Sequence, residues 1–270
     1  MPTSNPTPLV GFQGEPGAFS DEAARRLIDG AQTRGYVDFD ALIRATLAGE
    51  VDLGLLPVEN SIFGAIARAY DLLWESAGLH IVDETQIAVQ MCLIALPGAS
   101  EDRIREVRSH PVALEQVRGF TDAHPTWQRI AVADTAGAVA EMMQLGDPTI
   151  AAIGPAFAAE RYGATVLRRG IQDDAQNFTR FYLLSRESNA DPGAGRAVIA
   201  IEIPHRPGTL RAALGAFADQ AIDLRNLVAR PNHVDPFHYR FFFEMRDVDE
   251  PRLAAALAAV DGQTRIIGVY

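Results

Sequence analysis

A neutral hydroxyl stands beside a permanent cation in the segment Asn177-Phe178-Thr179-Arg180-Phe181. The apolar residues 182–184 that follow predict a strand, in which a threonine and an arginine take positions usually given to packing residues. An unpartnered buried guanidinium is costly, so we expect Arg180 to be paired when an anionic ligand arrives. The Thr179 hydroxyl could then donate a proton to, or position, a group that leaves that ligand. The structural alternatives are a β-branched strand residue for Thr179 and a salt bridge for Arg180.

Four junctions between predicted strands and helices carry a hydroxyl or a small residue where the helix begins. Each junction, taken alone, is explained as an N-cap. In parallel α/β domains such junctions gather at one edge of the sheet, and free N–H groups at helix N-termini suit a small anion such as a carboxylate. The junctions are Gly17-Ala18-Phe19-Ser20, Glu59-Asn60-Ser61, Ser109-His110-Pro111 and Asp134-Thr135-Ala136.

The sequence does not indicate a nucleotide, metal or lysine-dependent site. The glycines Gly11, Gly14 and Gly17 follow the spacing G-x-x-G-x-x-G, which differs from the dinucleotide-binding G-x-G-x-x-G, so a tight turn near a small ligand is the better interpretation. The 6 histidines have no metal-ligand spacing. All 24 basic residues are arginines, which excludes Schiff-base chemistry and the phosphate-loop lysine.

The composition indicates a cytoplasmic chain with small-molecule partners. A net charge of −11 without a basic cluster argues against nucleic acid and anionic membranes. The sequence has no apolar run long enough to cross a bilayer, and its first ten residues do not read as a secretory signal, so we expect a cytoplasmic location. The single cysteine, Cys92, lies in an apolar run and is expected to be a buried core residue.

The order of elements predicts an α/β fold with two kinds of domain. After a polar tail at residues 1–8, short apolar runs alternate with helical stretches to about residue 184, which favours mainly parallel sheets. Residues 185–196 read as a linker, and the order βαββαβ over 197–270 is the ferredoxin-like pattern. The predicted elements include a helix at 61–76, a strand at 86–96 and a helix at 111–119.

Four motifs in this order resemble those of the prephenate dehydratases, lyases of phenylalanine biosynthesis. The motifs are GFQGEPGAFS (11–20), PVENSIFG (57–64), SHPVALEQ (109–116) and NFTRF (177–181). The resemblance implies a two-lobed catalytic domain at 9–184, like a type 2 periplasmic binding protein. One lobe would hold residues 9–82 and 170–184, the other 90–168, with crossing segments near 81–90 and 170–179.

The resemblance also implies a reaction and a site. Prephenate loses its ring carboxylate and ring hydroxyl as carbon dioxide and water, and because the ring becomes aromatic no cofactor is needed. Thr179 would be catalytic and would hydrogen-bond or protonate the leaving hydroxyl. Arg180 and helix N-termini near Asn60-Ser61 and Thr135 would hold the carboxylates. The full set of predicted substrate-binding residues is Ala18, Ser20, Asn60, Ser61, Thr135, Asn177, Arg180 and Phe181.

Residues 197–270 resemble the ACT regulatory domain of this family, which binds L-phenylalanine. Its two effector motifs are altered here to Gly208-Thr209-Leu210-Arg211 and Val228-Ala229-Arg230-Pro231. The resemblance implies a homodimer or homotetramer paired through ACT domains. Arogenate dehydratase, a non-catalytic aromatic-metabolite sensor and a periplasmic binding protein are the alternatives. The predicted effector-binding residues are Pro207, Gly208, Thr209, Leu210, Asn226 and Arg230.

Overall fold

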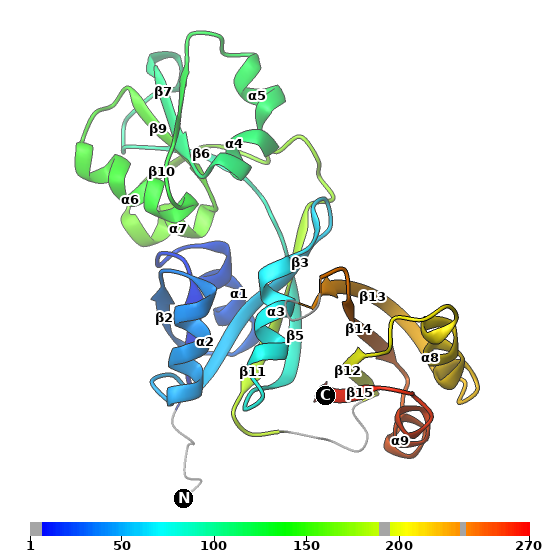
Figure 1. Ribbon diagram of the computed structural model, residues 1–270. Helices are drawn as coiled ribbons and strands as arrows, with labels where there is room; N and C mark the ends of the chain where they lie inside the picture. Colours follow the sequence, from blue (N-terminus) through cyan, green and yellow to red (C-terminus); the bar gives the residue numbers. More distant parts are fainter. Residues whose placement is uncertain (1–6, 189–194, 233–235) are drawn as a thin grey trace, which may run out of the picture. The chain divides into compact units, whose positions relative to one another are not determined.

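A computed structural model describes residues 7–188, 195–232 and 236–270 (Figure 1). Most of the predicted tail and half of the predicted linker therefore lie outside the described residues. The chain divides into two compact units, and the first comprises Met1–Gly64 and Thr85–Phe181. The second comprises Ala65–Glu84 and Tyr182–Tyr270, so one stretch from the first half of the chain groups with the C-terminal residues. The predicted domain boundaries stay a prediction.

The first sheet has the strand order β2-β1-β3-β11-β5, with β4 paired to β3. β1 runs parallel to both β2 and β3. Most residues of β3 are buried, as the continuous apolar run Leu-Gly-Leu-Leu-Pro-Val requires. The strands are β1 (Leu9–Gln13), β2 (Gln32–Tyr36), β3 (Leu53–Asn60), β4 (Gly64–Ala65), β5 (His80–Ala88) and β11 (Phe178–Ser185).

The second sheet has the order β10-β6-β9-β7-β8 and mixes parallel with antiparallel pairs. The chain passes from the first sheet to this one after β5 and returns before β11, so two crossing segments join the sheets (Figure 1). This is the two-lobed α/β organisation that the resemblance implied. The strands are β6 (Cys92–Ala95), β7 (Glu106–Ser109), β8 (Gln128–Ala131), β9 (Ile150–Gly154) and β10 (Thr165–Arg169).

Aspartate side chains cap the N-termini of two helices of the first unit. Asp38 accepts a hydrogen bond from the N–H of Ala41, and Asp134 accepts from the N–H groups of Ala136 and Gly137. Cys92 is buried in the core between β6 and its helices, and burial raises the pKa of its thiol. The helices are α1 (Phe19–Leu27), α2 (Phe39–Ala48), η1 (Glu101–Arg103), α4 (Pro111–Gln116), α5 (Arg118–Asp122), α6 (Thr135–Leu145) and α7 (Ala156–Tyr162).

The second unit contains a four-stranded antiparallel sheet of order β13-β14-β12-β15. Its chain order is βαββαβ, as predicted, and its core is built from β12, β14, α8 and α9. Helix α3 belongs to the same unit. The elements are α3 (Ala67–Glu75), β12 (Arg196–Glu202), α8 (Thr209–Ala218), β13 (Asp223–Pro231), β14 (Tyr239–Arg246), α9 (Glu250–Ala258) and β15 (Gln263–Val269).

Several predicted elements differ from the observed ones. The helix predicted at 61–76 begins only at Ala67, because residues 61–63 form a turn and Gly64 has a positive φ of 77°. The strand predicted at 86–96 is broken at 89–91, where the chain changes sheets. The helix predicted at 111–119 is two short helices. In the part of the chain that the structure describes, no helix is long and apolar enough to span a membrane.

Candidate active site

The side chain of Asn60, at the end of β3, joins the two strands that carry the predicted site. Its Oδ1 accepts hydrogen bonds from the backbone N–H groups of Ile62 (3.0 Å) and Phe63 (3.2 Å). Its Nδ2 donates to Asn177 Oδ1 (2.8 Å), to the Phe178 carbonyl (3.1 Å) and to Thr179 Oγ1 (3.2 Å). Asn60 is only 9% exposed, so these bonds are shielded from water. Asn60, Asn177 and Thr179 are therefore brought together as predicted residues of one site.

Ser61 makes a second connection between the same two segments. Its Oγ donates to the carbonyl of Gln176 (2.7 Å) and accepts from the N–H of Phe178 (2.9 Å), and its own N–H donates to the Phe178 carbonyl (2.9 Å). Ser61 thus fixes the register of the chain entering β11. Its hydroxyl is engaged by the backbone, so the structure gives Ser61 a positioning contact; its predicted contact with substrate stays a prediction.

Arg180 already has a protein partner, contrary to the prediction that an incoming anion would supply one. Its Nη2 donates to Glu59 Oε2 at 2.7 Å, with side-chain exposures of 19% and 34%. Glu59 lies on β3, the strand beside β11. The pairing of these strands places the carboxylate across from the guanidinium, which the local sequence did not reveal.

The two helix N-termini predicted to bind carboxylates do not offer the expected free N–H groups. No helix begins at Asn60-Ser61, and the N–H groups of Ile62 and Phe63 are taken by Asn60. At Thr135 the helix does begin, but the carboxylate of Asp134 accepts from its first free N–H groups at 2.8 and 2.7 Å. The expectation of free N–H groups at these two places is therefore wrong.

A small cavity of about 180 Å³ lies beside Asn177. Asn177 is 1% exposed, and its Nδ2 and the Oε1 of Gln116 are both buried without a hydrogen-bond partner among the described residues. Sequence reasoning missed Gln116 as a site residue, although it closes the motif SHPVALEQ. The cavity is lined by Ile62, Phe63, Glu115, Gln116, Asp173, Asp174 and Asn177.

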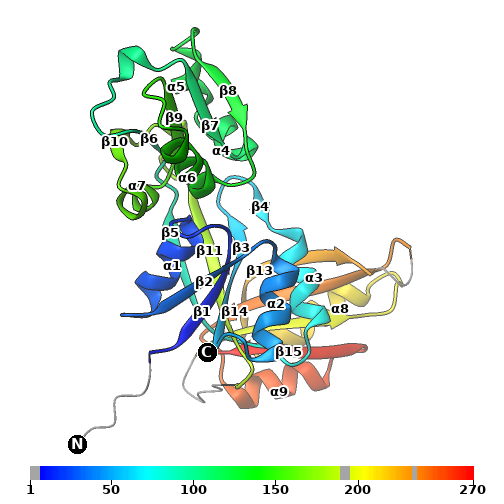
Figure 2. The same ribbon diagram turned by 90° about the vertical axis from the view of Figure 1, so that its left-hand side faces the viewer.

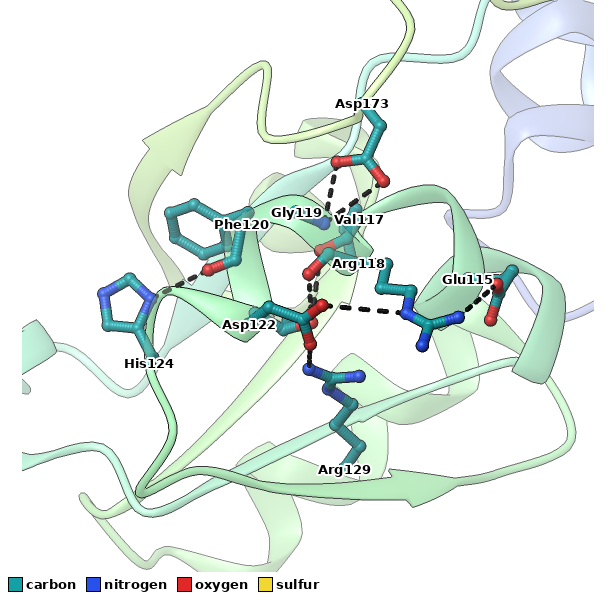
Figure 3. Close-up of polar contacts among 10 residues, drawn as sticks. Glu115, Val117, Arg118, Gly119, Phe120, Asp122, His124, Arg129 and Asp173 are labelled. Carbon is teal, nitrogen blue, oxygen red and sulfur yellow. Dashed lines mark hydrogen bonds and ion pairs between the residues drawn. The ribbon is translucent and has the colours of Figure 1, made fainter.

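Asp173 anchors the segment that leads to this cavity. Both of its carboxylate oxygens accept from the N–H of Gly119, at 3.0 and 3.2 Å, near the start of α5 (Figure 3). Its own N–H donates to the carbonyl of Gln116 at 2.7 Å. Arg118 pairs with Glu115 (3.3 Å) and Asp122 (3.6 Å), so several contacts hold the first turn of α5 around Gly119 (Figure 3). No pattern in the sequence pointed to Asp173.

The glycine motif forms the tight turn that its spacing predicts. Gly14 and Gly17 have φ angles of 116° and 95°, a region that favours glycine. The carbonyl of Pro16 in this turn accepts from the hydroxyl of Tyr162 at 2.8 Å, and burial raises the pKa of Tyr162 and keeps it protonated as a donor. A cavity of about 440 Å³ beside the turn is lined by residues 13–16, 35–37 and 133–134.

The remaining predicted substrate residues are packed into the protein. Ala18 precedes α1 and is 5% exposed, and Ser20 is 8% exposed. Phe181 is 1% exposed and belongs to the interior of β11. Thr135 begins α6 and is half-buried near the 440 Å³ cavity lined by Asp134. Contact of these four residues with substrate stays a prediction.

We expect Gly17→Ala to destabilise the fold more than Gly163→Ala. An added Cβ at Gly17 would meet the Cα of Ala158 at 3.0 Å in a strained backbone conformation, whereas at Gly163 (φ 71°) it would meet open space. The strained backbone alone costs about 1 kcal/mol for alanine, so the control should lose roughly that amount and Gly17→Ala clearly more. Urea unfolding of both variants measures the difference, and equal losses would show that the close approach to α7 is unimportant.

The predicted effector residues occupy two places in the second unit. Gly208, Thr209 and Leu210 line a cavity of about 330 Å³ together with Tyr239 and Phe241. Asn226 and Arg230 lie on β13 and are engaged elsewhere. Asn226 donates to Glu244 at 3.4 Å. Arg230 makes a two-point pair with Asp71, and this hydrogen bonding raises the pKa of Arg230.

Known proteins match most of the chain. The family model described as prephenate dehydratase matches residues 10–189. Arogenate dehydratase 3, chloroplastic, of Arabidopsis thaliana is 38% identical over 282 residues, covering 97% of this chain and 66% of the plant protein. The chain thus spans about two thirds of the length of that relative. A bifunctional N-acyl-homoserine lactone acylase/prephenate dehydratase of Komagataeibacter europaeus is 34% identical, covering 97% of this chain and 95% of that protein.

A solved structure shows the same fold. The prephenate dehydratase of Arthrobacter aurescens in complex with L-Phe superimposes with a TM-score of 0.86 at 26% identity. The match covers 96% of this chain and 88% of that one. The similarity therefore extends over the C-terminal strands as well as the region of the family model.

Proposed function

Because the chain belongs to the prephenate dehydratase family, we propose that it converts prephenate to phenylpyruvate by decarboxylating dehydration. The observation that carries the proposal is the bond from Asn60 to Thr179, since it prepares one hydroxyl for this reaction. Thr179 Oγ1 accepts from Asn60 Nδ2, which leaves the hydroxyl hydrogen available to point at a leaving group. Donation by Asn60 also stabilises negative charge that develops on Oγ1 as its proton moves.

In this reaction the ring carboxylate leaves as carbon dioxide and its bonding electrons enter the ring. The ring hydroxyl departs with a proton as water, and the product ring is aromatic. A threonine hydroxyl is a weak acid, so hydrogen bonding and positioning contribute more than complete proton transfer. The site residues hold and orient the reacting groups, and the driving force comes from aromatisation.

A second candidate substrate is arogenate, which has an ammonium group where prephenate has a keto group. The unpartnered Oε1 of Gln116 is an acceptor, and the carboxylates of Asp173 and Asp174 line the same cavity, which suits an ammonium donor. Asn60 fixes the Asn177 amide so that its Nδ2 is free to donate to a carboxylate. Plant relatives such as the Arabidopsis protein are named arogenate dehydratases.

Turnover of both substrates by the purified full chain tests the proposal. Prephenate gives phenylpyruvate, which is followed by its ultraviolet absorbance, whereas arogenate gives phenylalanine, which is followed by amino-acid analysis. We expect a higher kcat/KM for prephenate. A higher value for arogenate would favour the second candidate, and no turnover of either, together with tight binding of an aromatic metabolite, would support a non-catalytic sensor.

We expect Gln116→Glu to shift the preference toward arogenate. A carboxylate at this position would repel the keto oxygen of prephenate and attract the ammonium of arogenate, whereas the side-chain carboxylate is common to both substrates. The ratio of kcat/KM for arogenate to that for prephenate should rise by about tenfold, equal to about 1.4 kcal/mol. Gln128→Glu is the matched control, because it makes the same change at an exposed position outside the cavity lining. An unchanged ratio in Gln116→Glu would remove Gln116 from the site.

We further propose that residues 197–270 form an ACT domain that regulates turnover in response to L-phenylalanine. Support comes from the βαββαβ order and from the relative solved with L-Phe. Assays of prephenate turnover with and without L-phenylalanine test the regulation, and light scattering tests the predicted homodimer or homotetramer. The cytoplasmic location stays a prediction.

A further inference from the structure

Three side chains of helix α3 contact the C-terminal sheet. Tyr70 Oη donates to Glu244 Oε1 at 2.9 Å, and its ring packs edge-on against Phe242 with centroids 5.1 Å apart. The ring of Trp74 lies 3.8 Å from the guanidinium carbon of Arg240. Asp71 accepts both bonds of the Arg230 fork, at 2.9 and 2.8 Å.

These contacts fall on the sheet face opposite helices α8 and α9. Arg240, Phe242 and Glu244 alternate along β14, so they share one face, and Arg230 is paired directly across from Arg240. Phe243 and Met245 point to the other face of β14 and belong to the core with α8 and α9. Helix α3 therefore covers the second face of the sheet and lies against β13 (Figure 2).

The Asp71–Arg230 pair is a largely buried, two-point ion pair between α3 and the sheet. Asp71 and Arg230 have side-chain exposures of 9% and 20%, and both bonds of the planar fork are formed. Loss of the Asp71 carboxylate would remove both of these bonds from the Arg230 guanidinium, whose side chain is only 20% exposed. By contrast, the Arg68–Glu75 pair on the same helix is exposed by 42% and 47%.

The same helix continues directly from the catalytic turn. Asn60 holds the N–H groups of Ile62 and Phe63, and α3 begins four residues after Phe63. Between them, Gly64 has a positive φ and open space where a Cβ would lie, so it is the most permissive point of the connection. Only residues 64–66 separate the turn from α3 along the chain.

We propose that Asp71 is a positioning residue for the dehydratase site, and that the Asp71–Arg230 pair couples the C-terminal sheet to the turn that orders Thr179. The expected effect on turnover rests on the proposed dehydratase function. The state of the sheet, including any ligand bound there, acts on kcat through α3. The pair needs no direct contact with substrate, so KM is the parameter that it changes least.

Asp71→Asn and Glu75→Gln in the full chain provide a matched test. Asp71→Asn removes one charge at nearly constant shape, and we expect hydrogen exchange of residues 61–66 to become faster and kcat to fall about tenfold with KM little changed. Glu75→Gln should leave both quantities as in the wild type. The charge swap Asp71→Arg with Arg230→Asp should restore part of the protection and of kcat.

The two readouts separate failure of the coupling from failure of the proposed function. Hydrogen exchange is measured without substrate, so it reports on the coupling even in a chain that turns over neither prephenate nor arogenate. Unchanged exchange at residues 61–66 in Asp71→Asn would overturn the proposal. A uniform loss of protection across the chain would also overturn it, because that result marks a general loss of stability. If Asp71→Asn does not fold, the swap variant decides by the same readouts.

Discussion

Replacement of Thr179 by valine is expected to lower kcat for prephenate about 100- to 1000-fold, the usual cost of removing one hydrogen-bond donor from a reacting oxygen. Valine keeps the branched shape of threonine but has no hydroxyl. Asn60 Nδ2 would still donate to Asn177 and to the Phe178 carbonyl, so the turn at residues 60–63 should persist. KM should change little, because the hydroxyl is proposed to act mainly as the leaving group departs.

Thr179→Ser is the matched control, since it keeps the hydroxyl and removes only a methyl group. We expect it to retain activity within about tenfold of the wild type, while both variants unfold close to the wild-type urea midpoint. Initial rates of phenylpyruvate formation measure both effects. Turnover by Thr179→Val at the level of Thr179→Ser would show that the hydroxyl is not the group that assists departure.

The sequence predicted those parts of the site that lie on contiguous motifs. Thr179 and Asn177 belong to one motif and Asn60 to another, and the structure joins them by hydrogen bonds. The partner of Arg180 could not be predicted, because Glu59 becomes its neighbour only through the pairing of two strands that are distant in sequence. The local sequence therefore suggested an unpaired Arg180, whereas in the folded sheet Arg180 forms an ion pair with Glu59.

The same limit explains the elements that were misplaced. The polar segment Gln32–Tyr36 lacks the apolar pattern of a buried strand and was missed, since it lies at the edge of its sheet. A helix was predicted to start at residue 61, but the Asn60 side chain accepts from the N–H groups of Ile62 and Phe63 and stabilises a turn instead. These side-chain contacts form the turn, and helix α3 therefore begins later than the sequence predicted.

Asn60→Asp should impair both folding and turnover, because one atom changes from donor to acceptor. The carboxylate could still accept from Ile62 and Phe63, but its second oxygen would face the carbonyl oxygens of Asn177 and Phe178. It would also accept the hydroxyl hydrogen of Thr179, which would then be unavailable to a leaving group. A buried group facing unmatched partners costs on the order of 3 kcal/mol, and kcat should fall at least as far as in Thr179→Val. Urea unfolding and initial rates measure the two losses.

The pH dependence of Asn60→Asp distinguishes this explanation from simple misfolding. Burial and the facing acceptors would raise the pKa of the new carboxyl in the folded state above its unfolded value, because only the protonated form can donate to them. Stability contributed by that proton is present at low pH and is lost as pH rises through the folded-state pKa. The deficit relative to wild type should therefore shrink on going from about pH 8 to about pH 5. A deficit that stays constant with pH would mean that Asn60 is not needed as a donor, and the bond that prepares Thr179 would then lose its role in the proposed reaction.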